Sequence, residues 1–463
     1  MTIMKKTNKL LLLILAITGM FTACKKALDV EPKQTIDAGT AIQNDQDVNS
    51  LIVGGYALLG GGSLYGTNLL MLPDLLGSEG TCTWRGTFQS PRQIANKTMT
   101  RTNVDANLTW TAAYNAINIA NIALNSLSVV KDPDLKTQLE GEALFIRGIM
   151  HFELVRLYGL PWGATPANSQ LGVAIKTKPT NTEAEAFEKV PRSTVKEVYD
   201  LVIADLTKAA TLLPEENEKR ASKYAALAFL SRVYLQQGNY AAALAAADEV
   251  IESGLFKLNA SVSAVFSNRN TAESIWEIQQ NEQNNAGTIN NGMATFFASL
   301  PGIGRADVRM VVSFIANNYP AGDLRQSEWY YIGTGARPGN TYCGKWKSSS
   351  QNIPVIRIAE MYLTRAECNL ELGSAVTAAP AEDLAQIKNS IRTNSTAPAN
   401  PTLDDVRKER FIELAFEGQR IHNLKRLQLP TGSFAWNADK LVFPIPQREV
   451  DATSGVLVQN PGY

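Results

Sequence analysis

Apolar residues recur every three to four positions over several long segments, which is the spacing of an amphipathic helix. The segments 41–60 and 109–124 show this pattern, the first of them interrupted by glycine. The segment 132–159 opens with Asp-Pro and stops at a glycine, as helices commonly do. A further helix is expected over 193–214. The pattern therefore predicts that helices dominate the chain from residue 109 onward.

The clearest periodic unit is 223–251, which predicts two helices joined by a turn at Gly238-Asn239. Alanines in the second helix would let the two helices approach closely. A helix–turn–helix unit of about 34 residues is typical of a tetratricopeptide repeat. Residues 360–373 repeat part of this pattern of apolar positions. Helix pairs of this kind usually build a scaffold and bury little chemistry of their own.

Two segments lack a helical period. Residues 60–108 are rich in Gly, Thr, Asn and aromatic side chains, and residues 255–352 hold many Trp, Tyr and Phe. The first is predicted to be a long loop region, and such regions are usually functional or disordered. The second is predicted to be loop-rich, as one binding subdomain or as several loops. Helices are expected again over 354–373 and 402–427. The expected fold class is all-α, with a tetratricopeptide-like helix-pair scaffold and a loop-rich ligand-binding subdomain.

The first residues have the pattern of a cleavable export signal. Three lysines precede an apolar run over 10–17 that is too short to span a bilayer, which needs about 20 apolar residues. Phe21-Thr22-Ala23 then leads to Cys24. This arrangement resembles a bacterial lipobox, whose cysteine is lipidated and becomes the first mature residue, although Phe21 stands where Leu is usual. The prediction is a lipoprotein signal peptide over 1–23 and lipidation of Cys24.

These patterns divide the chain into four expected parts. They are the signal peptide (1–23), a lipidated tether (24–40), a helical region with the repeat-like scaffold (41–254) and a C-terminal region (255–463), whose loop-rich part (255–352) precedes helices over 354–427 and a tail.

Charge and length exclude some classes of protein. The formal net charge of the 463 residues is zero, and removal of 1–23, with three lysines and no acids, leaves about three negative charges. Nucleic-acid binding would require a basic patch or stripe, so it is not expected. No second stretch approaches membrane-spanning length, so the mature part is expected to be soluble and tethered by its lipid.

The other three cysteines, Cys82, Cys343 and Cys368, are widely spaced. Free structural thiols are expected, although one bridge among the three stays open. The spacing supplies no zinc site, and neither a metal nor a cofactor is predicted.

Signals for catalysis are weak. His151 and His422 are the only histidines, and no Gly-x-Ser-x-Gly occurs. The segment 339–345 matches most of a phosphate-binding loop, but Trp346 stands where Ser or Thr would hold magnesium. An acid recurs every four residues from Asp405 to Glu417, interleaved with basic residues that would offer local ion pairs on one helix. A glycosidase needs two carboxylates that face each other instead. The protein is therefore not expected to be an enzyme.

Five segments together resemble the SusD/RagB family of outer-membrane nutrient-binding lipoproteins. They occur in the family's order and extend to the last residue. In this sequence they are Gly141–Arg147 through Leu154–Trp162, Arg192–Val195 through Leu212–Pro214, Ile356–Glu367, Glu409–Arg420, and Phe443–Pro446 with Gln459–Tyr463. One departure is His422-Asn423, where the family usually has an aromatic residue and then Asp.

The resemblance implies an α-helical protein on the cell surface, anchored in the outer membrane through Cys24. Similar proteins form a lid over a SusC-like TonB-dependent transporter and bind glycans or, in some members, peptides. They have no catalytic activity. The function expected is the binding of oligosaccharides and their delivery to such a transporter.

Exposed aromatic side chains on loops would suit a sugar, since sugars stack apolar faces on rings and need planar polar partners for their hydroxyls. Trp84 and Arg85 lie in the first loop region, and Trp84 is the strongest single candidate. The second loop region contributes Arg325, Trp329, Tyr330, Tyr331, Asn340, Tyr342 and Trp346. A peptide ligand stays an alternative because Gln279–Asn291 is rich in amides. A glycoside hydrolase is the less favoured third reading.

Overall fold

The computed structural model describes residues 42–463, except 183–184, 186–187 and 289. Within it, residues 44–463 belong to one compact unit. The expected signal peptide, Cys24 and nearly all of the tether lie outside the described residues.

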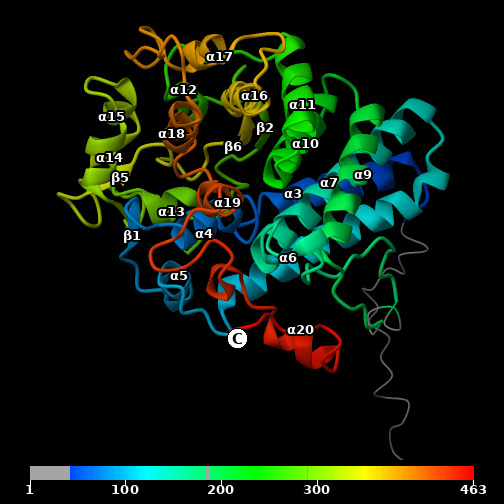
Figure 1. The fold of residues 1–463 in the computed structure, drawn as a ribbon. Helices are drawn as coiled ribbons and strands as arrows, with labels where there is room; N and C mark the ends of the chain where they lie inside the picture. Colours follow the sequence, from blue (N-terminus) through cyan, green and yellow to red (C-terminus); the bar gives the residue numbers. More distant parts are fainter. Residues whose placement is uncertain (1–41, 183–184, 186–187, 289) are drawn as a thin grey trace, which may run out of the picture. The chain divides into compact units, whose positions relative to one another are not determined.

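Helices supply most of the structure before residue 260 (Figure 1). They are α3 (Asp45–Leu59), α4 (Asn68–Leu76), α5 (Gln89–Ala95), α6 (Val104–Asn125), α7 (Pro133–Tyr158), α9 (Val195–Leu212), α10 (Lys223–Gln237) and α11 (Tyr240–Glu252), with short 3₁₀ turns at Leu127–Val129 and Pro166–Asn168.

Local sequence signals explain where these helices begin and end. The Asp132 carboxylate accepts backbone N–H bonds at the start of α7, and Thr194 forms a capping box with Glu197 at the start of α9. Gly238 ends α10 with a φ of 70°, a conformation that glycine adopts without steric cost. These observations confirm the helices predicted over 132–159, 193–214 and 223–251.

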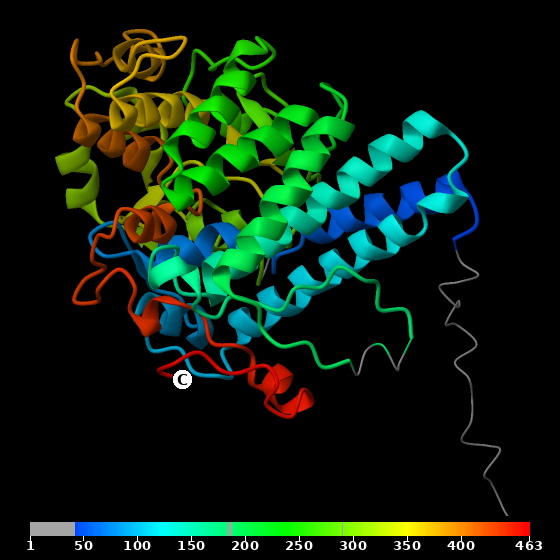
Figure 2. The same ribbon diagram turned by 45° about the vertical axis from the view of Figure 1, so that its right-hand side comes forward.

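Consecutive helices pack on one another through the first half of the chain. Figure 2 shows α3, α6 and α7 lying side by side, and α9 and α10 continue the series. The hairpin of α10 and α11 then packs against α16 (Ile358–Leu372). Leu235, Ala243, Leu244 and Cys368 form a buried apolar cluster there. The α10–α11 pair thus joins the helical half of the molecule to the remainder.

After residue 260 most elements are short, apart from α16 and α18. The helices are α12 (Ala264–Ser267), α13 (Met293–Phe297), α14 (Val312–Asn318), α15 (Leu324–Glu328), α16, α17 (Pro380–Ile387), α18 (Leu403–Glu413), α19 (Arg420–Arg426) and α20 (Gln447–Ala452), with a 3₁₀ turn at Asp439–Leu441. Six strands form three antiparallel two-stranded sheets: β1 (Cys82–Trp84) with β3 (Val308–Met310), β2 (Ser274–Ile278) with β6 (Ile353–Arg357), and β4 (Tyr330–Ile332) with β5 (Thr341–Cys343). The described chain is mainly helical, which confirms the expected fold class.

Two segments differ from their prediction because burial removes the periodic signal. Residues 60–108 are not one long loop, since they contain α4, β1 and α5. All nine residues of α4 are buried, so no polar face marks it as a helix. Residues 353–357 form strand β6, buried at every position, and the helix predicted from 354 begins only at Ile358.

The helix predicted over 402–427 is divided into α18 and α19. Between them Phe416 and Gly418 have left-handed backbone conformations, with φ of 64° and 78°. A Cβ on Gly418 would lie 2.7 Å from the carbonyl oxygen of Leu69 in α4. The chain therefore turns at Gly418, where only a glycine allows this close approach.

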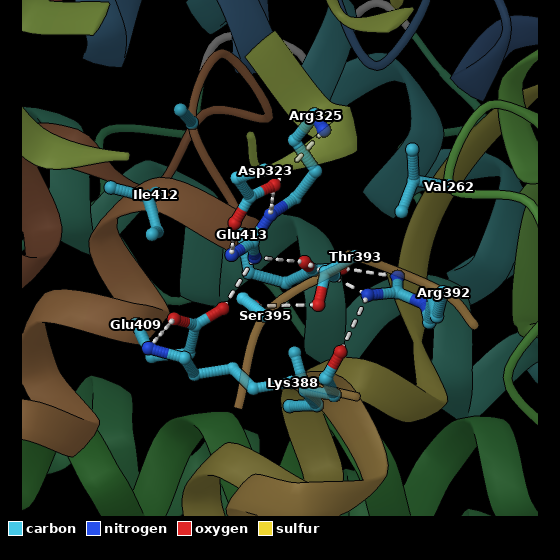
Figure 3. A network of polar contacts seen from close by, with 12 residues as sticks. Val262, Asp323, Arg325, Lys388, Arg392, Thr393, Ser395, Glu409, Ile412 and Glu413 are labelled. Atoms are coloured by element: carbon cyan, nitrogen blue, oxygen red, sulfur yellow. Dashed lines mark hydrogen bonds and ion pairs between the residues drawn. The ribbon is translucent and has the colours of Figure 1, made fainter. Parts of the chain in front are cut away.

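Glu409 and Glu413, the middle acids of the predicted row, lie at the centre of a buried ionic network (Figure 3). Glu413 accepts hydrogen bonds from three arginines, with Arg325 at 2.8 Å, Arg357 at 3.2 Å and Arg392 at 2.6 Å. Arg325 also donates to Glu409. These side chains are at most 2% exposed, and the arginines hold the pKa of Glu413 well below its usual range.

The ends of the row have other partners. Asp405 caps α18 through Thr402, and Glu417 accepts hydrogen bonds from Lys345 and Arg357. The acids are structural, as predicted, but the prediction of local pairing along one helix is wrong. The partners of Glu409, Glu413 and Glu417 come from distant segments because α18 is buried on several sides. Lys345, the lysine of the loop that resembles a phosphate-binding motif, is itself fully engaged in this network.

Cys82, Cys343 and Cys368 are buried free thiols within the described residues, and burial raises the pKa of each to about 12. In residues 42–463, apart from the few positions not described, no helix is both long enough and apolar enough to span a membrane. The same residues contain no group of three acidic, histidine or cysteine side chains placed to hold a metal.

Candidate ligand-binding site

Most aromatic residues predicted for ligand binding are core residues. Trp329, Tyr342 and Trp346 have no exposed surface, and Tyr330 is 5% exposed. The indole N–H groups of Trp329 and Trp346 each donate to a backbone carbonyl at 2.9 Å, and Tyr342 does so through its hydroxyl. The expectation that these four rings are exposed is wrong, because the loop-rich region builds its own core from them. In this conformation they cannot stack on a ligand.

Arg325 is likewise fully buried. Its guanidinium donates to Asp323, Glu409 and Glu413, so its hydrogen-bonding capacity is used inside the ionic network. The prediction that Arg325 offers a polar contact to a ligand is therefore not compatible with this structure.

Tyr331 and Asn340 are partly exposed, but both are hydrogen-bonded to backbone groups of the protein. The Tyr331 hydroxyl accepts a hydrogen bond from the backbone N–H of Ser299 at 2.8 Å. The Asn340 amide donates to the carbonyls of Arg337 and Pro338, both at 3.3 Å, and so closes the loop between β4 and β5.

Trp84 forms the floor of a different surface. Its ring is 9% exposed and packs 5.8 Å from the ring of Phe296 on α13. Its indole N–H donates to the carbonyl of Phe88 at 3.2 Å, which shapes the loop between β1 and α5. A Cβ on Gly86 would lie 2.5 Å from the Trp84 ring, so glycine lets the loop fold closely over the indole. Trp84 thus positions the loop more than it offers a free ring.

Phe88 and Arg305 lie above this floor. The Arg305 guanidinium carbon is 4.1 Å from the centre of the half-buried Phe88 ring, a cation–π contact. The guanidinium also reaches Asn290 and Thr87, both at 3.3 Å. Together these groups form an aromatic and cationic surface with amide and hydroxyl groups at its edge.

Asp307 holds the cations of this surface in place. Its carboxylate is buried and lies 3.1 Å from Arg305 Nε and 3.7 Å from Arg337 Nη2. Burial raises the pKa of Asp307, and the two guanidiniums oppose that rise. Arg337 also donates to the carbonyl of Arg85, whose own side chain is exposed. We call this surface the aromatic–arginine face. It comprises Trp84, Arg85, Phe88, Asn290, Arg305 and Arg337.

A pocket of about 330 Å³ opens beside the face. Phe88 and Phe296 form its aromatic wall, and Val104 and Leu108, which are 59% and 45% exposed, form part of its aliphatic wall. Its remaining lining is mainly small or polar, with four amide side chains at Asn68, Gln89, Asn290 and Asn291. Rings beside amide groups can stack on one face of a ligand and hydrogen-bond to its edge.

A larger cavity of about 410 Å³ lies between α18 and α19. Its walls are mainly apolar, with Phe411 and Leu414 among them, and Arg420 stacks on Phe411 at 4.1 Å. Arg407 and Arg426 line it as well, but both are paired with Glu367. This lining suits a polyhydroxylated ligand less well than the aromatic–arginine face does.

Four residues of the face are not among the predicted contacts: Phe88, Asn290, Arg305 and Arg337. Phe88 lies four residues after Trp84 in the same Gly- and Thr-rich segment, and Asn290 belongs to the amide-rich stretch considered for peptides. Those two signals could have identified them. Arg305 and Arg337 carry no comparable local signal, because Asp307 brings them together only in the fold.

Comparison with known proteins gives matches over most of the chain. Residues 28–235 match a family model described as "Starch-binding associating with outer membrane", and residues 311–441 match the model of the SusD family. SusD-like protein P2 of Formosa agariphila is 26% identical over 527 aligned positions, which cover 99% of this chain and 100% of the relative.

Solved structures share the fold. A SusD superfamily protein from Bacteroides thetaiotaomicron is 26% identical and superimposes with a TM-score of 0.79, over 90% of this chain and 100% of that chain. A laminarin-binding SusD-like protein, 21% identical, superimposes with a TM-score of 0.74 over 91% of this chain and 100% of that chain.

Proposed function

The chain belongs to the SusD/RagB family, and from this premise we propose that it binds oligosaccharides on the aromatic–arginine face. It holds them without catalysing a reaction and delivers them to a SusC-like TonB-dependent transporter of the outer membrane. A lipid on Cys24 keeps it at the cell surface.

The observation that carries the binding proposal is the contact of Phe88 with Arg305 beside an amide-lined pocket. A sugar ring has an apolar face that packs on an aromatic ring, and its hydroxyls pair with planar guanidinium and amide groups. Asp307 fixes Arg305 and Arg337 before a ligand arrives, so binding requires little ordering of either side chain. The laminarin-binding relative supports the same class of ligand.

The arrangement of acids favours binding over hydrolysis. Glycosidases use two carboxylates on opposite sides of the scissile bond. Among the described residues that line the pocket, Asp105 is the only acid, and Asp307 of the neighbouring surface is held by two arginines. Both histidines are buried, and burial lowers their pKa values, to about 4 for His151. Neither is placed at this surface to act as a base.

Peptides are a second candidate ligand because of one observation. Asn290 and Asn291, from the amide-rich segment of the sequence, lie on the pocket beside Gln89. Amide side chains can donate to and accept from a peptide backbone. The same face would then bind an extended peptide, with Phe88 contacting one of its side chains.

A binding screen distinguishes the two ligands. The purified protein is applied to an array of oligosaccharides and, separately, to a library of short peptides. The proposal expects specific binding to at least one oligosaccharide. Binding to peptides with no response to any oligosaccharide would replace it with the second candidate, and release of shortened oligosaccharide products would contradict the non-catalytic role.

A further inference from the structure

A small cavity lies where α19 crosses the C-terminal turn of α7, away from the aromatic–arginine face. Its volume is about 10 Å³, which is room for one water molecule or one monatomic ion. Arg156 of α7 and His422 and Lys425 of α19 line it, together with Trp162 and Tyr199. With Arg426, four basic side chains therefore line this small space.

Three of these side chains carry unused hydrogen-bond donors. Arg156 Nη2 donates a hydrogen bond to Glu153 at 2.5 Å, but Arg156 Nε and Nη1 have no partner among the described residues. His422 Nε2 is also without a partner there. Lys425 Nζ makes one long contact, 3.4 Å to the carbonyl of Arg156, although an ammonium has three donors.

All three side chains are buried, with exposures of 6% for Arg156, 1% for His422 and 4% for Lys425. Native proteins pair almost all buried polar groups, and an unpaired buried charge is costly. Water cannot reach these donors from bulk solvent without entering the cavity. The unused donors therefore point to an occupant that accepts hydrogen bonds.

The surrounding charges favour an anion as that occupant. Each neighbouring arginine contacts a carboxylate: Arg156 pairs with Glu153, Arg232 of α10 with Glu360, and Arg426 with Glu367, which also contacts Arg407 and Arg410. Lys425 has no carboxylate partner among the described residues. Burial and the charge of Arg156 lower the pKa of Lys425 to about 7, so a negative charge beside it would stabilise its protonated form.

We propose that this cavity is a binding site for a small monovalent anion of the size of chloride. Arg156 Nη1, Lys425 Nζ and the Nε2–H tautomer of His422 donate to it. A neutral water would accept at most two of these hydrogen bonds and would leave the positive charge uncompensated. The anion links α7 to α19, so its binding stabilises the contact between the N-terminal helices and the C-terminal region.

Thermal unfolding of the purified full chain tests the site in solution. Chloride is exchanged for gluconate, which is too large for the cavity, at constant ionic strength and pH. We expect Tm to rise with chloride, by about 2 °C at a concentration ten times the Kd, and to increase with the logarithm of chloride concentration above it. Lys425→Met, which keeps the side-chain volume, should abolish this rise. Lys219→Met, at an exposed lysine, should retain it.

A crystal of the wild-type protein soaked in bromide provides a test that needs no variant. The expected result is an anomalous peak within hydrogen-bond distance of Arg156 Nη1 and Lys425 Nζ. Equal Tm values in chloride and gluconate would overturn the proposal, as would a cavity that holds water without anomalous signal. A bromide peak without any chloride dependence of Tm would mean binding at crystal concentration only and would also overturn it.

Discussion

At the scale of single residues, Glu413 is the carboxylate at the centre of the buried ionic network. It is fully buried and bonded to Arg325, Arg357 and Arg392, which come from three different segments. Removing one member of a buried ionic group leaves its partners as uncompensated charges, which costs far more than removing a surface pair. The ionic network therefore holds the loop-rich region around α18.

We predict that Glu413→Gln lowers the free energy of unfolding by about 3–5 kcal/mol, because three guanidiniums lose the charge that compensates them. Glu140→Gln, which removes an exposed pair with Lys208, should cost less than about 1 kcal/mol. Denaturant unfolding of both variants, analysed for ΔG and m-value, measures the difference. Equal losses in the two variants would contradict the role given to the network.

Among single residues, the exposure of the aromatic side chains was predicted least accurately. A tryptophan in a segment without helical period has the same sequence signature whether it is exposed or buried. Trp329 and Trp346 are core residues because short strands and buried carbonyls surround them, and neither feature can be inferred from their neighbours in the sequence. Trp84, the strongest candidate from the sequence, is buried as well, because Phe296 and the loop at Gly86 pack against its ring.

At the scale of elements, helices with clear end signals could be predicted, whereas short buried elements could not. α9 and α11 have a polar face, and α7 and α10, although buried along most of their length, have end signals at Asp132-Pro133, Gly159 and Gly238, so their limits follow from the sequence. α4 and β6 are enclosed on all sides and have no alternation to detect. The break between α18 and α19 is also a tertiary effect, because it results from the approach of α4 to Gly418.

That close approach leads to a prediction about two glycines. Gly418→Ala should lower the free energy of unfolding by about 1–3 kcal/mol, since the new methyl group meets the Leu69 carbonyl and φ is positive. Gly54→Ala in α3 is the matched control. Nothing lies within 4 Å of its Cβ position, so alanine should stabilise the helix by about 0.5–1 kcal/mol. Opposite signs are expected in thermal or denaturant unfolding, and a destabilised Gly54→Ala with a neutral Gly418→Ala would contradict this account.

At the scale of the whole molecule, the family assignment explains the order of the segments and the fold, whereas the ligand depends on a few loop residues. The two family models cover the helical scaffold and the region from α14 to the turn before the last helix. Of the aromatic–arginine face, Asn290 and Arg305 lie between the two matched ranges, and its other four residues lie within them.

Membrane attachment is a separate prediction at this scale. Cys24→Ser should move the protein from the membrane fraction to the soluble fraction, because the acyl chains supply the apolar surface that holds it there. Lys33→Ser, in the predicted tether, keeps the cysteine and should remain in the membrane fraction. Fractionation of cells followed by immunoblotting measures both. Retention of Cys24→Ser in membranes would contradict the lipid anchor.

The most direct test of the central claim is a calorimetric titration with the oligosaccharide that the array selects. Phe88→Ala should weaken its binding about fivefold or more, since an aromatic contact contributes about 1 kcal/mol. Ile391→Ala, at a side chain that is 75% exposed and outside the face, should bind like the wild type. Unchanged affinity in a folded Phe88→Ala variant would show that the ligand binds elsewhere and would contradict the assignment of the aromatic–arginine face.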